Sequence, residues 1–393
     1  MRQGRKVAAI LAVLMLSAGC LDARHYPPPN LPPSARLIPA EQPPAELPTV
    51  VTASARPSRT VLAISGGGLC GAYTAGVLKG WTAAGTRPQF DVVTGVSTGA
   101  LIAPLAFLGP DSDAQLEEWY TGAKPSDIYR RRSLPAWFWA DSLADSAPLK
   151  QRIEAVVTEE FLARVAQAHN AGRRLYVGTT DLDSKRLVVW DMGAIAAGEE
   201  ANKLELFRTV LLASCAIPGL LSPVSIDIEV NGKRRTELHV DGGVSAAAFL
   251  PPVALAGDLG PGTRSNRETT VNVIVSGKVV GHGRPVARRL VDVSEESLNG
   301  LLRAQVRGDL QRIALQAQKA GATFGFTAVP DDFGVGESAT LNPQMLRRLF
   351  DEGYKFGSSR TAWRQTAPGL EVNEPPPRTG TRFRLIKAGA KEQ

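Results

Sequence analysis

Cysteine and histidine, the residues that most often build metal sites, are scarce in this sequence. Its 393 residues include 3 cysteines and 4 histidines. No cluster of histidine, cysteine and aspartate has the spacing of a metal site, and no stretch has the pattern of a calcium-binding loop. We therefore expect neither a metal nor another cofactor.

The patterns of nucleic-acid-binding proteins are also missing. The formal net charge is +7, but lysine and arginine are scattered among 38 acidic residues. The one compact basic run is Arg130–Arg132, and no zinc-finger spacing or other recognisable motif accompanies it. We expect no nucleic-acid partner, and the positive charge favours a mild attraction to anionic lipid surfaces.

The amino terminus has the pattern of an export signal. The apolar stretch over residues 7–16 follows three basic residues and precedes small residues that end at Gly19. It is too short to cross a bilayer, and this order is typical of a secretory signal over residues 1–19. Removing the signal takes away its three basic residues, so the formal net charge falls from +7 to +4.

The residue after this signal is Cys20. The pair Gly19–Cys20 resembles the end of a bacterial lipoprotein signal, in which the cysteine is lipidated and becomes the first residue. Ser17 stands where such signals usually have leucine, and Leu21 follows the cysteine where aspartate would favour the inner membrane. The resemblance implies an outer-membrane anchor through Cys20. The alternative is ordinary cleavage nearby, which gives a periplasmic or secreted protein.

One folded domain is expected in the rest of the chain. Residues 20–59 are rich in proline and show no hydrophobic periodicity, which is typical of a semi-rigid spacer. The domain is expected over residues 60–374, before the proline cluster that opens the tail 375–393, and 44% apolar residues supply ample material for a core. It contains Cys70 and Cys215, either bridged or as two buried thiols.

Short apolar stretches typical of buried strands alternate with stretches of helical spacing. This alternation predicts an α/β domain with a parallel sheet covered by helices on both faces. The expected strands are residues 61–64, 90–94, 175–180, 187–190, 226–230, 237–240 and 271–275. The expected helices are residues 73–81, 101–107, 204–214, 298–317 and a helix that begins at 343.

The stretch Gly95-Val96-Ser97-Thr98-Gly99 follows one expected strand and precedes an expected helix. A turn this sharp pushes the serine hydroxyl out of the sheet, and its glycines leave room for the close approach of the backbone. The context therefore predicts Ser97 as a nucleophile. The five-residue pattern also occurs by chance in many proteins, so it does not settle this role alone.

Gly66, Gly67 and Gly68 lie one βαβ unit before Ser97. If the two flanking strands are parallel neighbours, the loops after them emerge at the same edge of the sheet. The glycine amides are then placed to bind the oxyanion of a tetrahedral intermediate. No GKS, GKT or G-x-G-x-x-G pattern supports a phosphate or dinucleotide site, and a turn without chemistry is the other alternative.

Asp241 is the candidate general base. It ends an expected strand and is followed by Gly242 and Gly243. A carboxylate serves as a base where burial raises its proton affinity enough. A plain Asp-Gly-Gly turn is the alternative without chemistry. The other candidate base is His239, which shares a strand face with Asp241 and would make a serine–histidine–aspartate triad.

Taken together, these motifs resemble those of the patatin-like phospholipase family. The family has a glycine-rich oxyanion loop, a G-x-S-x-G elbow and a later D-G-G, and the match covers roughly residues 61–275. In this sequence the motifs are Gly66–Gly71, Gly95–Gly99 and Asp241–Gly243, with the further element A-S-x-A-x-P at Ala213–Pro218 and a looser match at Thr180–Leu182.

The resemblance implies a three-layer α/β/α fold with a central, mainly parallel sheet. It also implies a Ser97–Asp241 dyad without histidine, an acyl-enzyme intermediate and lipid acyl esters as substrates, as in a phospholipase A or a lysophospholipase. Cys70 stands where many members have arginine or lysine, which puts a contact with lipid phosphate in doubt. An esterase with a histidine-based triad and an envelope lipoprotein without turnover are the alternative functions.

Overall fold

The computed structural model describes most of the expected folded domain. The residues described are 58–132, 141–230, 233–256, 268–280, 285–334, 342–359 and 363–369. The expected signal, Cys20, nearly all of the spacer and the tail lie outside the described residues.

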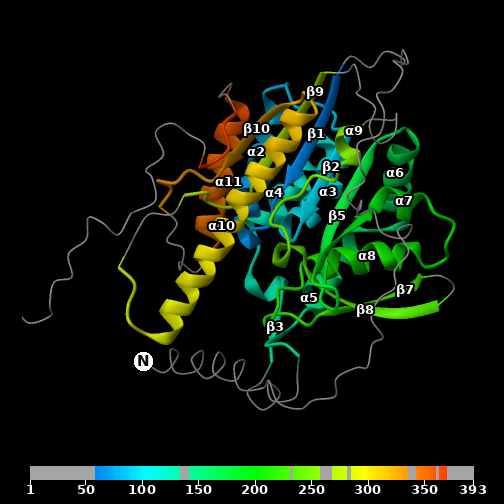
Figure 1. The fold of residues 1–393 in the computed structure, drawn as a ribbon, viewed down its shortest axis with the longest axis horizontal. Coiled ribbons are helices and arrows are strands. Elements are labelled where there is room, and N and C mark those ends of the chain that lie inside the picture. Colours follow the sequence, from blue (N-terminus) through cyan, green and yellow to red (C-terminus); the bar gives the residue numbers. More distant parts are fainter. Residues whose placement is uncertain are drawn as a thin grey trace, which may run out of the picture.

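A central sheet of eight strands organises the described residues (Figure 1). Its order is β10-β9-β1-β2-β5-β8-β7, with β6 paired to β5. Neighbours from β10 to β5 are parallel, whereas β6, β8 and β7 join through antiparallel pairs. The strands are β1 (Ser58–Ile64), β2 (Val92–Val96), β5 (Arg174–Asp181), β6 (Arg186–Asp191), β7 (Val224–Val230), β8 (Lys233–Asp241), β9 (Glu268–Val275) and β10 (Thr323–Ala328).

Helices cover both faces of this sheet, which confirms the expected α/β/α layers (Figure 1). One face carries α2, α3, α8 and α11, and the long helix α10 lies across the other. The helices are α2 (Gly71–Ala83), α3 (Thr98–Leu108), α4 (Asp113–Thr121), α5 (Ala147–Val156), α6 (Glu159–Asn170), α7 (Met192–Ala197), α8 (Lys203–Ser214), α9 (Val253–Ala256), α10 (Leu290–Lys319) and α11 (Pro343–Ser358). Shorter elements include the 3-10 turns η2 (Gly68–Cys70) and η6 (Gly242–Val244) and the two-stranded pair β3 (Arg130–Arg131) and β4 (Ala144–Asp145).

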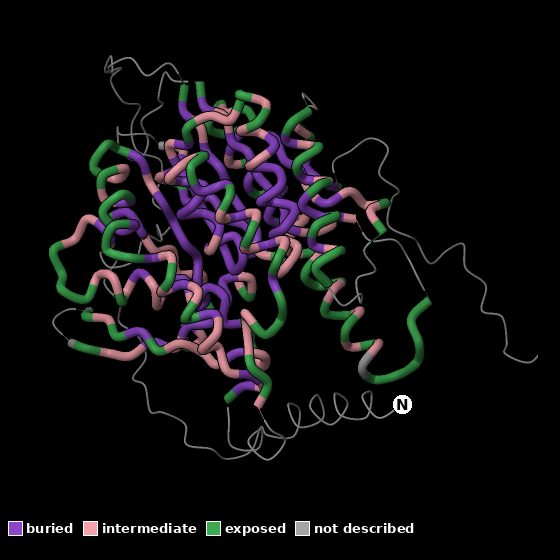
Figure 2. The backbone as a smooth tube through the Cα atoms, turned by 180° about the vertical axis from the view of Figure 1, so that it is seen from behind, coloured by how far each residue is buried: buried purple, intermediate pink, exposed green. Residues whose placement is uncertain are grey.

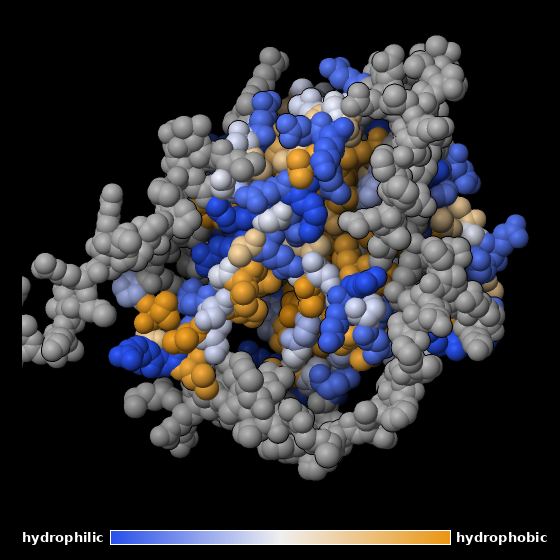
Figure 3. All heavy atoms as spheres, viewed as in Figure 1, coloured by the Kyte–Doolittle hydropathy of each residue, from blue (hydrophilic) through white to orange (hydrophobic). Residues whose placement is uncertain are grey.

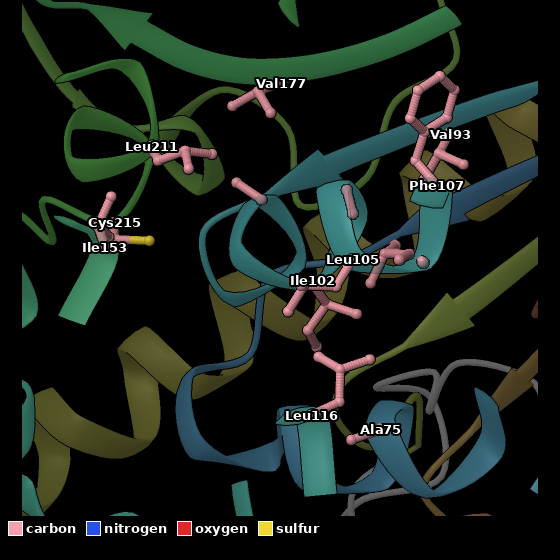
Figure 4. Close-up of a cluster of buried hydrophobic side chains, with 14 of the residues drawn as sticks. Ala75, Val93, Ile102, Leu105, Phe107, Leu116, Ile153, Val177, Leu211 and Cys215 are labelled. Atoms are coloured by element: carbon pink, nitrogen blue, oxygen red, sulfur yellow. The ribbon is translucent and has the colours of Figure 1, made fainter. Parts of the chain in front are cut away.

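Each face of the sheet has its own hydrophobic core. Leu62 and Ile64 of β1 belong to the core under α2 and α3, while Val61 and Ala63 belong to the core under α10. Successive residues of a strand point to opposite faces, so a buried strand must be apolar at every position. Figure 2 shows the buried backbone concentrated in the sheet and the inner turns of the helices, and Figure 4 shows the first core around α3.

Candidate active site

Ser97 occupies the turn between β2 and α3. Its backbone has φ 54° and ψ −124°, so it lies at positive φ, which a residue with a side chain rarely adopts. The turn is tight because a Cβ at Gly95 would lie 2.3 Å from the carbonyl oxygen of Gly99. Such strain is kept only where the surrounding structure holds it, and it is typical of functional turns.

Asp241 is brought to Ser97 by the register of β5. Gly178 of β5 pairs with Val96, the residue before Ser97. Thr179, the next residue of β5, pairs with Asp241 itself. β2 and β8 therefore meet end to end along β5, from opposite directions. The serine and the carboxylate lie at the junction of these two strands.

The two side chains are hydrogen-bonded, and the carboxyl of Asp241 has a raised pKa. Burial raises the pKa of Asp241 from 3.8 to about 6, while hydrogen bonds from the Ser97 side chain and the Gly243 amide act in the lowering direction. The Gly243 amide donates to Oδ1 of Asp241 over 2.7 Å. A carboxylate with this proton affinity, in contact with a serine hydroxyl, can accept the hydroxyl proton near neutral pH.

Two residues that the sequence analysis did not assign to the site hold the Ser97 turn. The amide of Ser97 donates to Oγ of Ser214 over 3.0 Å, and that hydroxyl donates to the carbonyl of Gly178 over 2.7 Å. The thiol of Cys215 donates to the carbonyl of Ser97 over 3.2 Å. Both residues belong to the A-S-x-A-x-P element, so this motif supplies the support of the turn.

The glycine loop lies beside Ser97, as expected for the loops that follow two parallel neighbouring strands of a βαβ unit. β1 and β2 are parallel neighbours, and a Cβ at Gly66 would lie 3.2 Å from Cβ of Ser97. A Cβ at Gly67 would lie 1.7 Å from the carbonyl oxygen of Ser276, so only glycine fits there. The loop therefore packs tightly between Ser97 and Ser276, the residue that follows β9.

The three glycine amides are not equivalent. The amide of Gly66 donates to the carbonyl of Ala247 over 2.9 Å and is already occupied. Gly67 and Gly68 are exposed at the amino terminus of η2 and α2, and their amides have no acceptor within the described part of the chain. All three amides were expected as donors, but within the described residues Gly67 and Gly68 alone of the three offer free donors.

The glycine loop, the serine elbow and the D-G-G turn lie in one segment that matches a known family. Residues 62–254 match the family model described as "Patatin-like phospholipase". This part of the chain belongs to the patatin-like phospholipase family.

Solved structures that match the chain include two bacterial proteins. VipD from Legionella pneumophila matches with a TM-score of 0.39 and 12% identity over 77% of this chain. ExoU from Pseudomonas aeruginosa, in complex with SpcU from the type III secretion system, matches with a TM-score of 0.35 and 13% identity over 77% of this chain. The chain spans 66% of the VipD chain and 52% of the ExoU chain. No curated protein matches the sequence.

In the patatin-like domain, His239 lies away from the nucleophile. It is fully buried, its Nδ1 lies 3.0 Å from Oγ1 of Thr179, and its Nε2 lies 3.3 Å from Oε2 of Glu237. Its ring also contacts the ring of Trp190. Nδ1 is thus engaged by Thr179, and Nε2 lies near the Glu237 carboxyl without a hydrogen bond, whereas the side chain that interacts with Ser97 is Asp241. The geometry favours a carboxylate base over the histidine alternative.

Both cysteines of the patatin-like domain are free thiols. Burial raises the pKa of Cys70 to about 11, and the nearby ammonium of Lys278 acts in the opposite direction. Lys278 donates to the carbonyls of Asp331 and Phe333. A cation thus lies near the loop position at which many family members carry a basic residue. Among the described residues, no group of three or more histidine, cysteine or acidic side chains is arranged to hold a metal.

Proposed function

We propose that the chain hydrolyses acyl esters of lipids through Ser97 and Asp241. The observation that carries this proposal is the hydrogen bond between the two side chains, combined with the raised pKa of the buried carboxyl, about 6. At neutral pH the carboxylate is mostly charged, yet its proton affinity is high enough for proton transfer. Membership of the patatin-like phospholipase family supports a lipid ester as the substrate.

The reaction proceeds in two acyl-transfer steps. In the first, Oγ of Ser97 attacks the ester carbonyl carbon as its proton passes to Asp241. The tetrahedral intermediate collapses, the carbon–oxygen bond of the ester breaks, and the leaving alcohol takes the proton from Asp241. In the second, Asp241 takes a proton from water, the resulting hydroxide attacks the acyl-enzyme, and the fatty acid leaves as Ser97 regains its proton.

Free backbone amides stabilise the negative oxygen of each intermediate. Gly67 and Gly68 are the donors in this proposal, because the Gly66 amide is held by Ala247. They lie at the amino end of α2, where the helix dipole also favours negative charge. One preorganised donor of this kind is worth roughly 100- to 1000-fold in rate.

The localisation proposed for this activity is the cell envelope, with Cys20 as a lipidated anchor, in the outer membrane. The order of charged, apolar and small residues before Cys20 supports this assignment. Metabolic labelling with a radioactive fatty acid tests it. The label should enter the exported chain and be lost in the Cys20→Ser variant, whereas equal labelling of both would contradict it.

A substrate panel tests the enzymatic proposal. Phospholipids, lysophospholipids and soluble short-chain esters are offered to the protein and to its Ser97→Ala variant, and released fatty acid is measured. We expect release by the protein and none above background by the variant, with a fluorophosphonate probe labelling Ser97 only in the former. A folded protein that neither takes the probe nor releases fatty acid would instead support a lipoprotein without turnover.

A further inference from the structure

Helix α10 extends past the edge of the sheet at which Ser97 lies. It follows β9 and precedes β10, which are parallel neighbours, so it starts at the carboxyl edge of the sheet and runs back over it. Its 30 residues span about 45 Å, while the 8 residues of β9 span about 26 Å. The amino-terminal half of α10 therefore projects beyond the sheet, as Figure 1 shows.

The two halves of α10 use different sides of the helix. In the carboxyl-terminal half, Leu310, Ile313 and Ala317 are fully buried in the core. At about 100° per residue, these three fall on one side of the helix. In the amino-terminal half, Leu290, Val293 and Leu301 lie away from that side, so they cannot join the same core.

The projecting half carries an exposed apolar surface, which we call the α10 apolar face. Its side chains are 45% to 69% exposed. The face consists of Leu290, Val293, Leu298, Leu301 and Leu302. At about 100° per residue these lie within roughly half of the helix circumference, and no charged residue from 290 to 308 falls inside that half.

The charged residues of the same segment lie on the other side. They are Asp292, Glu295, Glu296, Arg303 and Arg307. Within the described residues, no helix is both long and apolar enough to cross a membrane. An uncharged apolar side opposite a charged side is instead the pattern of a helix that lies in a membrane interface.

Two other exposed apolar residues lie close in sequence to residues of the active site. Val244 is 51% exposed in the turn that follows Asp241, and Ile217 is 42% exposed beside the carbonyl of Ala216, which holds the Asp241 amide. Figure 3 shows apolar surface along the projecting part of α10 and further apolar surface across a hollow from it.

We propose that the α10 apolar face docks on the surface of a lipid bilayer and holds the catalytic edge of the sheet against it. This proposal rests on the proposed function, because a lipid ester must reach Ser97 from a membrane. We favour a bilayer over a protein partner, because a protein bound to the α10 apolar face would separate the bilayer from the active site. The exposed Arg288 and Arg289, immediately before α10, suit an anionic lipid surface.

Vesicle flotation tests the docking without catalysis. The chain is exported behind an ordinary cleavable signal and carries Cys20→Ser and Ser97→Ala, so that neither an acyl anchor nor turnover contributes. The vesicles are equimolar phosphatidylcholine and phosphatidylglycerol. We expect the parent protein to float, and Leu298→Glu/Leu301→Glu to lower its partition at least about tenfold, because two apolar side chains no longer enter the interface.

The matched control is Asn299→Glu/Gln318→Glu, which adds the same charge to the other side of the same helix. It should float like the parent protein. With Ser97 restored, the ratio of vesicle hydrolysis to soluble-ester hydrolysis should fall about tenfold in Leu298→Glu/Leu301→Glu and stay unchanged in the control.

Three results would overturn the docking proposal. In the first, the parent protein does not float. In the second, Leu298→Glu/Leu301→Glu leaves flotation unchanged. In the third, these substitutions convert a dimer to a monomer, while neither the parent protein nor the variant binds vesicles. The third result would assign the α10 apolar face to a second copy of the chain. If the proposed function alone is wrong, the proteins should float as expected, but the protein with Ser97 restored should hydrolyse neither the soluble nor the membrane-bound ester.

Discussion

Ser97 and Asp241 are in contact because consecutive residues of β5 fix the ends of two different strands. Gly178 pairs with Val96, immediately before Ser97, and Thr179 pairs with Asp241. The two side chains therefore stand on strand ends rather than on long loops. A site built on strand ends keeps its geometry without substrate, which lowers the cost of reaching the transition state.

Replacing Asp241 by asparagine should slow the acylation of Ser97. Asparagine is similar in size and can still accept the Gly243 amide, but it cannot accept the serine proton. We expect the rate of fluorophosphonate labelling at Ser97 to fall about 100- to 10,000-fold. Time-resolved labelling measures this rate, with Asp183→Asn, at an exposed position, as the control. Unchanged labelling of folded protein would remove Asp241 from the mechanism.

Activity should depend on pH through the charge of Asp241. Only the charged carboxylate can accept a proton, and its pKa is raised to about 6, chiefly by burial. We therefore expect kcat/KM for a soluble ester to fall as pH decreases through about 6 and to level off above about 7. A profile that stays flat down to about pH 4, the ordinary range of aspartate, would contradict the raised pKa.

The charged carboxylate of Asp241 should lower the free energy of unfolding at neutral and alkaline pH. Its pKa is 3.8 ordinarily and about 6 in the fold, so the folded state binds the proton more tightly and loses stability as pH rises between these values. At pH above about 7, Asp241→Asn should raise the free energy of unfolding by about 3 kcal/mol. Below about pH 4 the gain should vanish.

Urea denaturation at the two pH values measures this difference. Asp183→Asn should change the free energy of unfolding little at either pH, since its side chain is exposed. A loss of stability in Asp241→Asn at high pH would show that the buried charge carries no such cost.

The sequence predicted the βαβ unit and its two loops because their signals are local. An apolar strand, a glycine-rich turn and a helix follow one another twice within residues 61–107. The parallel pairing of β1 with β2 confirms this unit. The contact between Ser97 and Asp241 has a different origin. It depends on β5 pairing with β2 and β8 along one edge, which is a tertiary relationship without a local signature.

Other features also lay beyond local patterns. β10 was not expected, although Phe324 and Phe326 alternate toward one core, because its flanking turns carry weak signals. α10 begins at Leu290 rather than near Leu298, since Leu290 and Val293 lie off the apolar stripe that Leu298 and the residues after it form. The occupied amide of Gly66 follows from a contact with Ala247, far away in sequence.

Replacing His239 by glutamine separates the dyad from a triad. His239 contacts Thr179 and Glu237 inside the fold, so its loss should reduce stability but lower kcat/KM for a soluble ester by less than about tenfold. Circular dichroism shows whether the variant is folded, and ester hydrolysis gives the rate. A loss of about 1000-fold or more in folded protein would make histidine the base.

Removing the hydroxyl of Ser214 should loosen the turn that presents the nucleophile. Ser214→Ala leaves the buried Ser97 amide without its acceptor, which should cost about 1–3 kcal/mol of stability. Because the turn then relaxes, kcat should fall about 10- to 100-fold while KM changes little. Ser142→Ala is the control, since that buried hydroxyl also donates to a backbone carbonyl, 3.1 Å away on Ala144, but not at the site. Equal losses of kcat in both variants would reduce Ser214 to a general structural role.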